Sequence, residues 1–300
     1  MKWLKVSFSI YVCVSLFLLS SCVDKGKSMF SFDNGVTFDT LLVEKVYHLD
    51  DDTTMPSCNL SIKFIYPVES GKMNLADLQQ IFVTSALGNA FDSIAVSDAV
   101  AAYINNYIDN YKSDASIYRN NISDLDAEER NEAYHYIGDD DSLDKPTVFY
   151  SYYETLSDTI VYNNRGVLSF QVRQANSKDD LVSYNSYRNF VVNFKTGTLL
   201  TESDIFIPGY DLALRKIFIA TLLEQNNVKT INDLEDLGYF GIEEIMPNKN
   251  FLVTDKGITY TFNKGEYSAY QLKSPAVFIP YDLITTILKN NTVVYKLAEN

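Results

Sequence analysis

The stretch 250–284 constrains the fold most, because its hydrophobic pattern permits few arrangements of the backbone. Residues 251–254 and 258–262 are two short runs in which apolar and polar residues alternate. The turn between them contains Asp255 and Gly257, and such residues between two alternating runs are typical of a tight β-hairpin. We therefore expect an antiparallel hairpin here.

The rest of the C-terminal third extends this hairpin into a small domain. An apolar run at 276–279 ends at Pro280, whose fixed φ and missing N–H suit the first turn of a helix. Apolar residues at helical spacing predict an amphipathic helix upstream, and the end of the chain has the pattern of an edge strand. We therefore expect a third strand at 276–279, helices at 210–225, 231–237 and 281–288, and a strand at 292–297.

The N-terminal part shows the same mixture of strands and helices. Asn74 is placed as an N-cap and Gly88 as the end of one helix, and a second helix begins near Ser97. The acidic segment 123–144 has no strand pattern and predicts a solvated loop. Period-two alternation predicts strands at 37–49, 59–66, 147–155, 158–162, 167–173 and 187–194.

These patterns predict an α+β protein with two small antiparallel sheets, each packed with helices. The Ile207-Pro208-Gly209 sequence breaks the pattern, and we take it as the boundary between two domains. The N-terminal domain would cover 37–207 and the C-terminal domain 208–300. With 46% hydrophobic residues, the chain has ample material for two cores.

The first 21 residues predict a targeting segment rather than part of the fold. Lys2 and Lys5 precede an apolar run too short to span a bilayer, and the sequence Leu19-Ser20-Ser21-Cys22 follows. This sequence resembles the bacterial lipobox, in which the cysteine receives the lipid. We therefore expect signal peptide 1–21, lipidation at Cys22, a tether over 22–36, and attachment to a membrane of the cell envelope, with the outer membrane favoured. An ordinary cleaved signal with a chance cysteine is the alternative.

The net charge of −14 limits the possible partners. Such an acidic chain would be repelled by the phosphates of nucleic acid, whereas it could attract a basic protein. The simpler interpretation is that the charge confers solubility. Once Cys13 leaves with the signal peptide and Cys22 carries lipid, Cys58 stands alone, and we expect it to be a small buried hydrophobe.

The residue inventory does not favour an enzyme. His48 and His135 are the only histidines, and their separation forms no metal-binding pair. The acidic run Asp139–Asp144 lacks the glycine of a calcium loop, and Tyr150 would stand where that loop needs a glutamate. We therefore expect no metal site, no cofactor and no catalytic residues.

Tyrosine is abundant, with 22 residues. Several lie close together in the second half of the N-terminal domain, where packing within the sheet is the simplest explanation. The functional alternative is an aromatic surface that binds a glycan or a protein. Its candidate residues are Tyr150, Tyr152, Tyr184 and Tyr187.

Two stretches resemble a known family. The sequence FLVTDKGITYTF at 251–262, followed by Ile279-Pro280-Tyr281, resembles the C-terminal domain of RsiV-type extracytoplasmic proteins. The sequence NFVVNFKTGTLL at 189–200 resembles the junction between the two domains of that family. The N-terminal domain of the pair also precedes the catalytic domain of PdaC-type peptidoglycan deacetylases. Here Asn193 replaces the usual aspartate, and 181–184 replaces a Gly-Gly-Ala-His loop.

The resemblance implies a non-catalytic envelope lipoprotein that binds an extracytoplasmic protein or a cell-wall ligand. RsiV uses the corresponding domains to sense lysozyme, so a lysozyme-like basic protein is the partner that the resemblance suggests. A structural or assembly factor of the outer membrane, or a cell-wall hydrolase of unrecognised type, are the alternatives.

Overall fold

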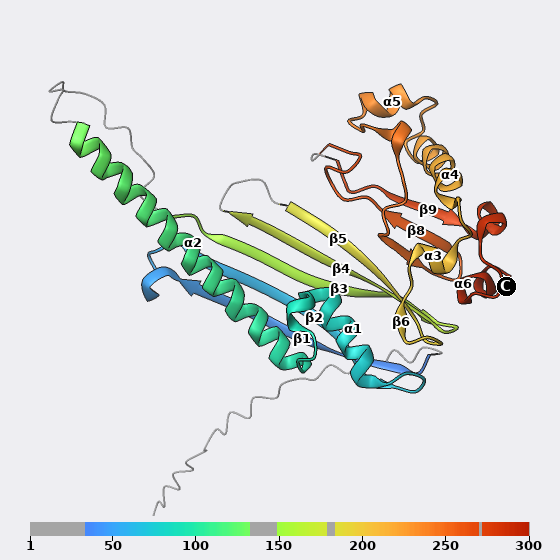
Figure 1. Cartoon of the computed structure of the whole chain (residues 1–300), viewed down its shortest axis with the longest axis horizontal. Helices are drawn as coiled ribbons and strands as arrows, with labels where there is room; N and C mark the ends of the chain where they lie inside the picture. The colour runs from blue at the N-terminus through green and yellow to red at the C-terminus, as the bar shows by residue number, and fades with distance from the viewer. Residues whose placement is uncertain (1–33, 133–148, 179–183, 270–271, 300) are drawn as a thin grey trace, which may run out of the picture.

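A computed structural model describes residues 34–132, 149–178, 184–269 and 272–299 (Figure 1). It confirms the α+β class, with a six-stranded sheet and a separate three-stranded sheet. Cys22, His135 and the acidic run at 139–144 lie outside the described residues. No helix in the described ranges is long and apolar enough to cross a membrane.

The larger sheet has the strand order β1-β2-β3-β4-β5-β6. Neighbouring strands are antiparallel except β2 and β3, which run parallel, so the expectation of a purely antiparallel sheet is wrong at this pair. A parallel pair needs a long crossover, and the chain supplies one that contains two helices. The strands are β1 (Val36–His48), β2 (Ser57–Ser70), β3 (Tyr152–Asn164), β4 (Val167–Lys178), β5 (Tyr184–Asn193) and β6 (Thr198–Leu199).

The crossover helices are α1 (Leu75–Leu87) and α2 (Val96–Glu132). As predicted, the Asn74 side chain caps α1 by accepting hydrogen bonds from the backbone N–H groups of Ala76 and Asp77, and α1 ends at Gly88. The prediction of a loop from residue 123 is wrong as far as Glu132, because α2 continues to that residue. Alanine, glutamate and arginine at 127–130 favour helix intrinsically, which explains the extension.

The first hydrophobic core lies between these helices and one face of the larger sheet (Figure 1). The alternation in β2 places Leu60, Ile62 and Phe64 on the buried face, as the sequence indicates. Phe82 of α1 stacks on Phe170 of β4 with ring centroids 4.2 Å apart. Burying each such side chain contributes about 1.5–3 kcal/mol, which holds the helices on this face.

The C-terminal part contains the predicted three-stranded sheet, with β7 (Phe251–Val253) paired to β8 (Gly257–Thr261) and β8 to β9 (Ala276–Pro280). Helix α4 (Tyr210–Gln225) packs on this sheet through Leu214, Phe218 and Leu222. Leu212, which the helical spacing also assigns to the core, is instead 57% exposed. Short helices α3 (Glu202–Ile205) and α5 (Ile231–Asp236) accompany it.

Two predictions at the C-terminus need correction. The expected edge strand at 292–297 is helix α6 (Val293–Ala298), because the Thr292 side chain accepts a hydrogen bond from the Tyr295 N–H and so caps a helix. The expected helix at 281–288 is two separate 3-10 turns, Tyr281–Leu283 and Thr285–Ile287.

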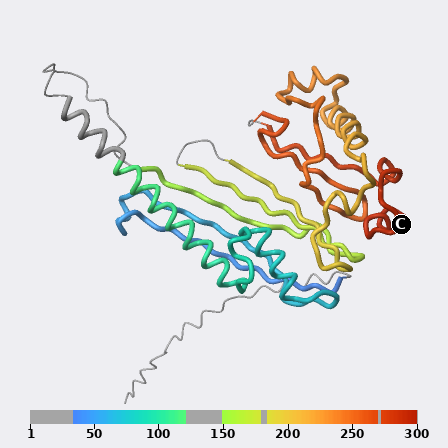
Figure 2. Tube along the Cα trace, viewed as in Figure 1, coloured from blue at the N-terminus to red at the C-terminus, as the bar shows by residue number. Residues whose placement is uncertain are grey.

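The smaller sheet packs against the face of β4 and β5 that is turned away from α1 and α2 (Figures 1 and 2). The hydroxyl of Ser169 in β4 donates to the backbone carbonyl of Val253 in β7 at 2.6 Å. The second core includes Val167 and Val191 of the larger sheet together with residues of the C-terminal part. It therefore draws on both sides of the predicted boundary at Ile207.

Candidate functional site

A cavity of about 710 Å³ lies between α2 and the adjoining ends of β3 and β4. We call it the tyrosine pocket. Helix α2 lines it with Tyr107, Asn110, Tyr111 and Asp114, and the strands line it with Tyr152, Glu154, Asn176, Ser177 and Lys178.

The local geometry of each element explains why these side chains converge. Tyr107, Tyr111 and Asp114 are four and three residues apart, so they lie on one face of the helix. Tyr152 and Glu154 are two residues apart on β3 and share one face of the sheet. Tyr152 lies directly opposite Lys178 of β4 in the antiparallel ladder, and Glu154 opposite Asn176. One helical stripe therefore covers two cross-strand pairs.

Tyr152 is at the centre of the contacts in the tyrosine pocket. Its ring meets the ring of Tyr111 edge to face, with centroids 4.9 Å apart. Its hydroxyl donates to Asp114 Oδ2 at 3.2 Å and accepts from Lys178 Nζ at 2.7 Å. Burial raises the pKa of Tyr152, so the hydroxyl stays protonated and keeps this donor role at neutral pH.

Glu154 forms the buried floor of the pocket. Its Oε1 accepts hydrogen bonds from the Tyr103 hydroxyl and from Gln174 Nε2. Burial raises the pKa of Glu154, whereas these hydrogen bonds oppose the rise because they stabilise the carboxylate. Burial is also the main reason that the pKa of Tyr107 is raised. The pocket thus offers aromatic rings beside fixed carboxylate and amide groups.

Cys58 lies beside this site on β2, opposite Tyr152 in the parallel ladder. It is completely buried, as the sequence predicts, and it is a free cysteine within the described residues. Burial, with a smaller contribution from the charge of Glu154, raises the pKa of its thiol to about 12. The thiolate is therefore scarce at neutral pH, and Cys58 serves as a packing residue.

The structure does not bring the four candidate tyrosines together. Tyr152 lies in the tyrosine pocket, whereas Tyr187 of β5 lines a separate groove on the opposite face of the larger sheet. Tyr150 and Tyr184 are exposed and line neither cavity among the described residues, although the Tyr150 carbonyl accepts a hydrogen bond from Tyr111. Closeness along the sequence does not determine whether side chains on different strands lie on the same face of the sheet.

The helical half of the site was not identified from the sequence. Tyr107 and Tyr111 belong to an apolar stripe that predicts only a buried helix face. That this stripe lies over β3 and β4 depends on the parallel crossover, for which no local signal exists.

His48 has a structural contact, with Nδ1 3.2 Å from the Met55 carbonyl oxygen. Within the described residues no group of three potential metal ligands occurs.

Comparison with known proteins places this geometry in context. Residues 203–282 match a family described as "Protein of unknown function (DUF3298)". A crystal structure of a DUF3298 family member from Bacteroides fragilis superposes with a TM-score of 0.73 at 23% identity, covering 89% of this chain and 99% of that chain. A DUF3298 family protein from Pseudomonas aeruginosa gives a TM-score of 0.56 at 14% identity, with coverages of 86% and 97%.

These similarities define the fold of the chain. The C-terminal region carries the DUF3298 match, and nearly the whole length shares its fold with solved members of that family. No match was found among curated proteins.

Proposed function

We propose that this protein is a non-catalytic binding protein of the cell envelope, anchored by lipid on Cys22, whose tyrosine pocket takes a sugar ring of a cell-wall glycan. The observation that carries this proposal is the arrangement around Tyr152, where two tyrosine rings in edge-to-face contact lie beside a carboxylate and an ammonium group. The resemblance to RsiV-type proteins supports the envelope location and a binding role.

The chemistry of the pocket suits a sugar. The apolar face of a sugar ring packs on aromatic rings, while its hydroxyl groups need fixed donors and acceptors around the edge. Tyr107 and Tyr152, which are partly exposed, supply ring surface, and Asn110, Asp114 and Asn176 supply polar groups. The volume of about 710 Å³ is within the range of small-molecule sites.

The polar groups are already held by one another, which supports binding rather than turnover. Asp114 and Lys178 are both fixed through the Tyr152 hydroxyl, and the Glu154 carboxylate is fixed by Tyr103 and Gln174. Such preorganised groups orient a ligand at little entropic cost.

The test is calorimetric titration of the full-length protein with soluble peptidoglycan fragments. Tyr152→Leu should weaken binding about three- to tenfold, the loss expected for one aromatic contact. Tyr153→Leu is the matched control, because Tyr153 is the next residue on β3 but is 44% exposed and points to the other face. Equal affinities of the two variants, or no binding by the wild type, would refute the glycan site. Cleaved fragments after incubation would instead support the hydrolase alternative.

A basic protein partner is a second candidate, favoured by the net charge of −14. Charge attraction would raise the association rate, and a few buried aromatic contacts would supply most of the affinity. Immobilised c-type lysozyme should therefore bind the protein and keep part of that binding at about 0.5 M salt, where the Debye length is only ~4 Å. Cytochrome c is the basic control. Equal binding to both proteins would indicate a non-specific acidic surface.

A further inference from the structure

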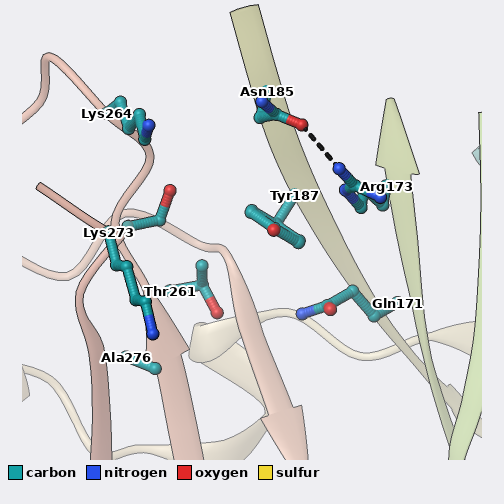
Figure 3. Close-up of a pocket in the computed structure, with 9 residues that line it drawn as sticks. Gln171, Arg173, Asn185, Tyr187, Thr261, Lys264, Lys273 and Ala276 are labelled. Atoms are coloured by element: carbon teal, nitrogen blue, oxygen red, sulfur yellow. Dashed lines mark hydrogen bonds between the residues drawn. The ribbon is translucent and has the colours of Figure 1, made fainter. Parts of the chain in front are cut away.

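A second cavity of about 400 Å³ lies between the two sheets, on the face of β4 and β5 opposite the tyrosine pocket (Figure 3). We call it the basic groove. Arg173 of β4 forms one wall, and Lys264 and Lys273 come from the C-terminal part. Figure 3 shows the Tyr187 ring between Arg173 on one side and Thr261 and Lys273 on the other.

The charges of the basic groove are unusual for this chain. Acidic residues outnumber basic ones 39 to 25 in the sequence, yet the described lining of the groove contains three cations and no carboxylate. Within the described ranges none of the three forms a salt bridge. Three neighbouring positive charges repel one another in the absence of an anion, so an anionic ligand would relieve a cost already present in the fold.

The neutral groups of the groove also present hydrogen-bond donors. Asn185 Oδ1 accepts from Arg173 at 2.9 Å, which leaves the amide N–H groups of Asn185 free to donate. Thr261 Oγ1 accepts from Asn189 Nδ2, so its own hydroxyl hydrogen is available. The hydroxyl oxygen of Ser274 is buried and has no partner within the described part of the chain. A buried hydroxyl without a partner is costly, and a ligand oxygen would satisfy it.

The walls of the groove are held rigidly. The Asn263 side chain accepts from the Tyr187 backbone N–H at 2.7 Å and donates to the Tyr187 carbonyl at 3.1 Å. This reciprocal pair fixes the backbone of β5 against the segment that follows β8. The backbone walls of the groove therefore keep their places whether or not a ligand is bound.

We propose that the basic groove binds an oxyanion, either a phosphate or a carboxylate group, presented by an extracytoplasmic ligand. Arg173 would contact two oxygens with its planar guanidinium, while Lys273 and Lys264 would supply point charges. The Ser274 and Tyr187 hydroxyls would donate to the remaining oxygens. This site is separate from the tyrosine pocket, and its existence does not depend on the proposed glycan binding.

The test is calorimetric titration of the full-length protein with two probes, inorganic phosphate and the dipeptide D-alanyl-D-alanine. Tighter binding of phosphate would indicate a phosphorylated glycan or lipid headgroup, and tighter binding of the dipeptide would indicate a wall peptide. Lys273→Gln and Arg173→Gln should each weaken the preferred probe about three- to tenfold. Arg173→Lys should lose less than Arg173→Gln, because it keeps the charge and loses only the bidentate geometry.

Lys256→Gln is the matched control, because Lys256 is an exposed lysine in the β7–β8 hairpin and does not line the basic groove. It removes the same charge from the same small sheet, so it should leave affinity within about twofold. Thermal unfolding of each variant verifies that the fold is intact. Failure of both probes to bind the wild type, or equal weakening by Lys256→Gln and Lys273→Gln, would overturn the proposal.

Discussion

Asn250 bonds Tyr187 across the junction of the two sheets: its side-chain amide donates to the Tyr187 backbone carbonyl at 2.9 Å, although 63 residues separate them in the chain. Its Oδ1 also accepts from the backbone N–H of Asn189 at 2.7 Å. Both backbone groups lie on the edge of β5 that faces β6. Strand β6 pairs with this edge only at Val192 and Asn193, so it does not cover the part around Tyr187. Together with Asn263, which bonds the Tyr187 N–H and carbonyl, this side chain takes the place of a neighbouring strand.

Asn250→Ala should therefore destabilise the protein by about 1–3 kcal/mol, because it leaves the Asn189 backbone N–H without its acceptor, whereas the Tyr187 carbonyl keeps its bond from Asn263. Chemical denaturation monitored by circular dichroism measures this change. Asn105→Ala, at an exposed position in α2, is the control and should change stability by no more than about 0.5 kcal/mol. An Asn250→Ala variant as stable as this control would contradict the role assigned to the edge.

A substitution at Gly257 tests how closely strands β8 and β9 approach each other. A Cβ atom at this position would lie 2.2 Å from the carbonyl oxygen of Ile279, which is far inside van der Waals contact. Gly257→Ala should therefore cost about 2–3 kcal/mol, since backbone rather than a flexible side chain must move. In Gly71→Ala the new Cβ would lie 3.7 Å from the nearest backbone atom, so that variant should melt close to the wild type. Similar melting temperatures for the two variants would contradict this close approach of the strands.

Asp158 makes stability depend on pH. Its Oδ1 accepts from the Ile65 N–H at 2.7 Å, while its Oδ2 is buried with no partner among the described residues. Burial raises the pKa of Asp158 to about 7 in the folded protein, compared with 3.8 for an ordinary aspartate. The folded state therefore binds the proton more tightly, and the contribution of this residue to stability falls as pH rises from about 4 to 7.

Asp158→Asn keeps an oxygen acceptor for Ile65 and removes the buried charge. The variant should be more stable than the wild type by roughly 2–4 kcal/mol at pH 8, with a much smaller difference near pH 4. Urea denaturation at the two pH values measures the difference. Asp255→Asn, at an exposed position, controls for removal of a negative charge. A stabilisation by Asp158→Asn that is the same at both pH values would rule out titration of Asp158 as the cause.

Lipidation at Cys22 is tested directly in a bacterial host. Cys22→Ser should abolish incorporation of labelled fatty acid and move the protein from the detergent phase to the aqueous phase, because the acyl chains supply the membrane affinity. Cys13→Ser removes a cysteine within the expected signal peptide and should leave labelling unchanged. Labelled fatty acid on the Cys22→Ser protein would show that the anchor lies elsewhere.

Local patterns predicted several elements correctly because their determinants are close in sequence. The Asn74 cap, the Gly88 helix end and the hairpin around Gly257 each depend on a few adjacent residues. Helix α4 occupies the predicted range, although Leu212 faces solvent because the small sheet covers only part of the helix. Where two local signals compete, as at Thr292, the capping interaction outweighed the alternating pattern.

The sequence by itself determined the α+β class, the alternation that buries one face of β2, and the chemical types available for binding. Only the tertiary structure decided which of these side chains lie close together. The parallel crossover brings Tyr111 of α2 against Tyr152 of β3, and packing of the two sheets brings Arg173 near Lys273. These contacts join residues distant in the chain through backbone pairing and burial, and no short segment encodes such long-range pairing.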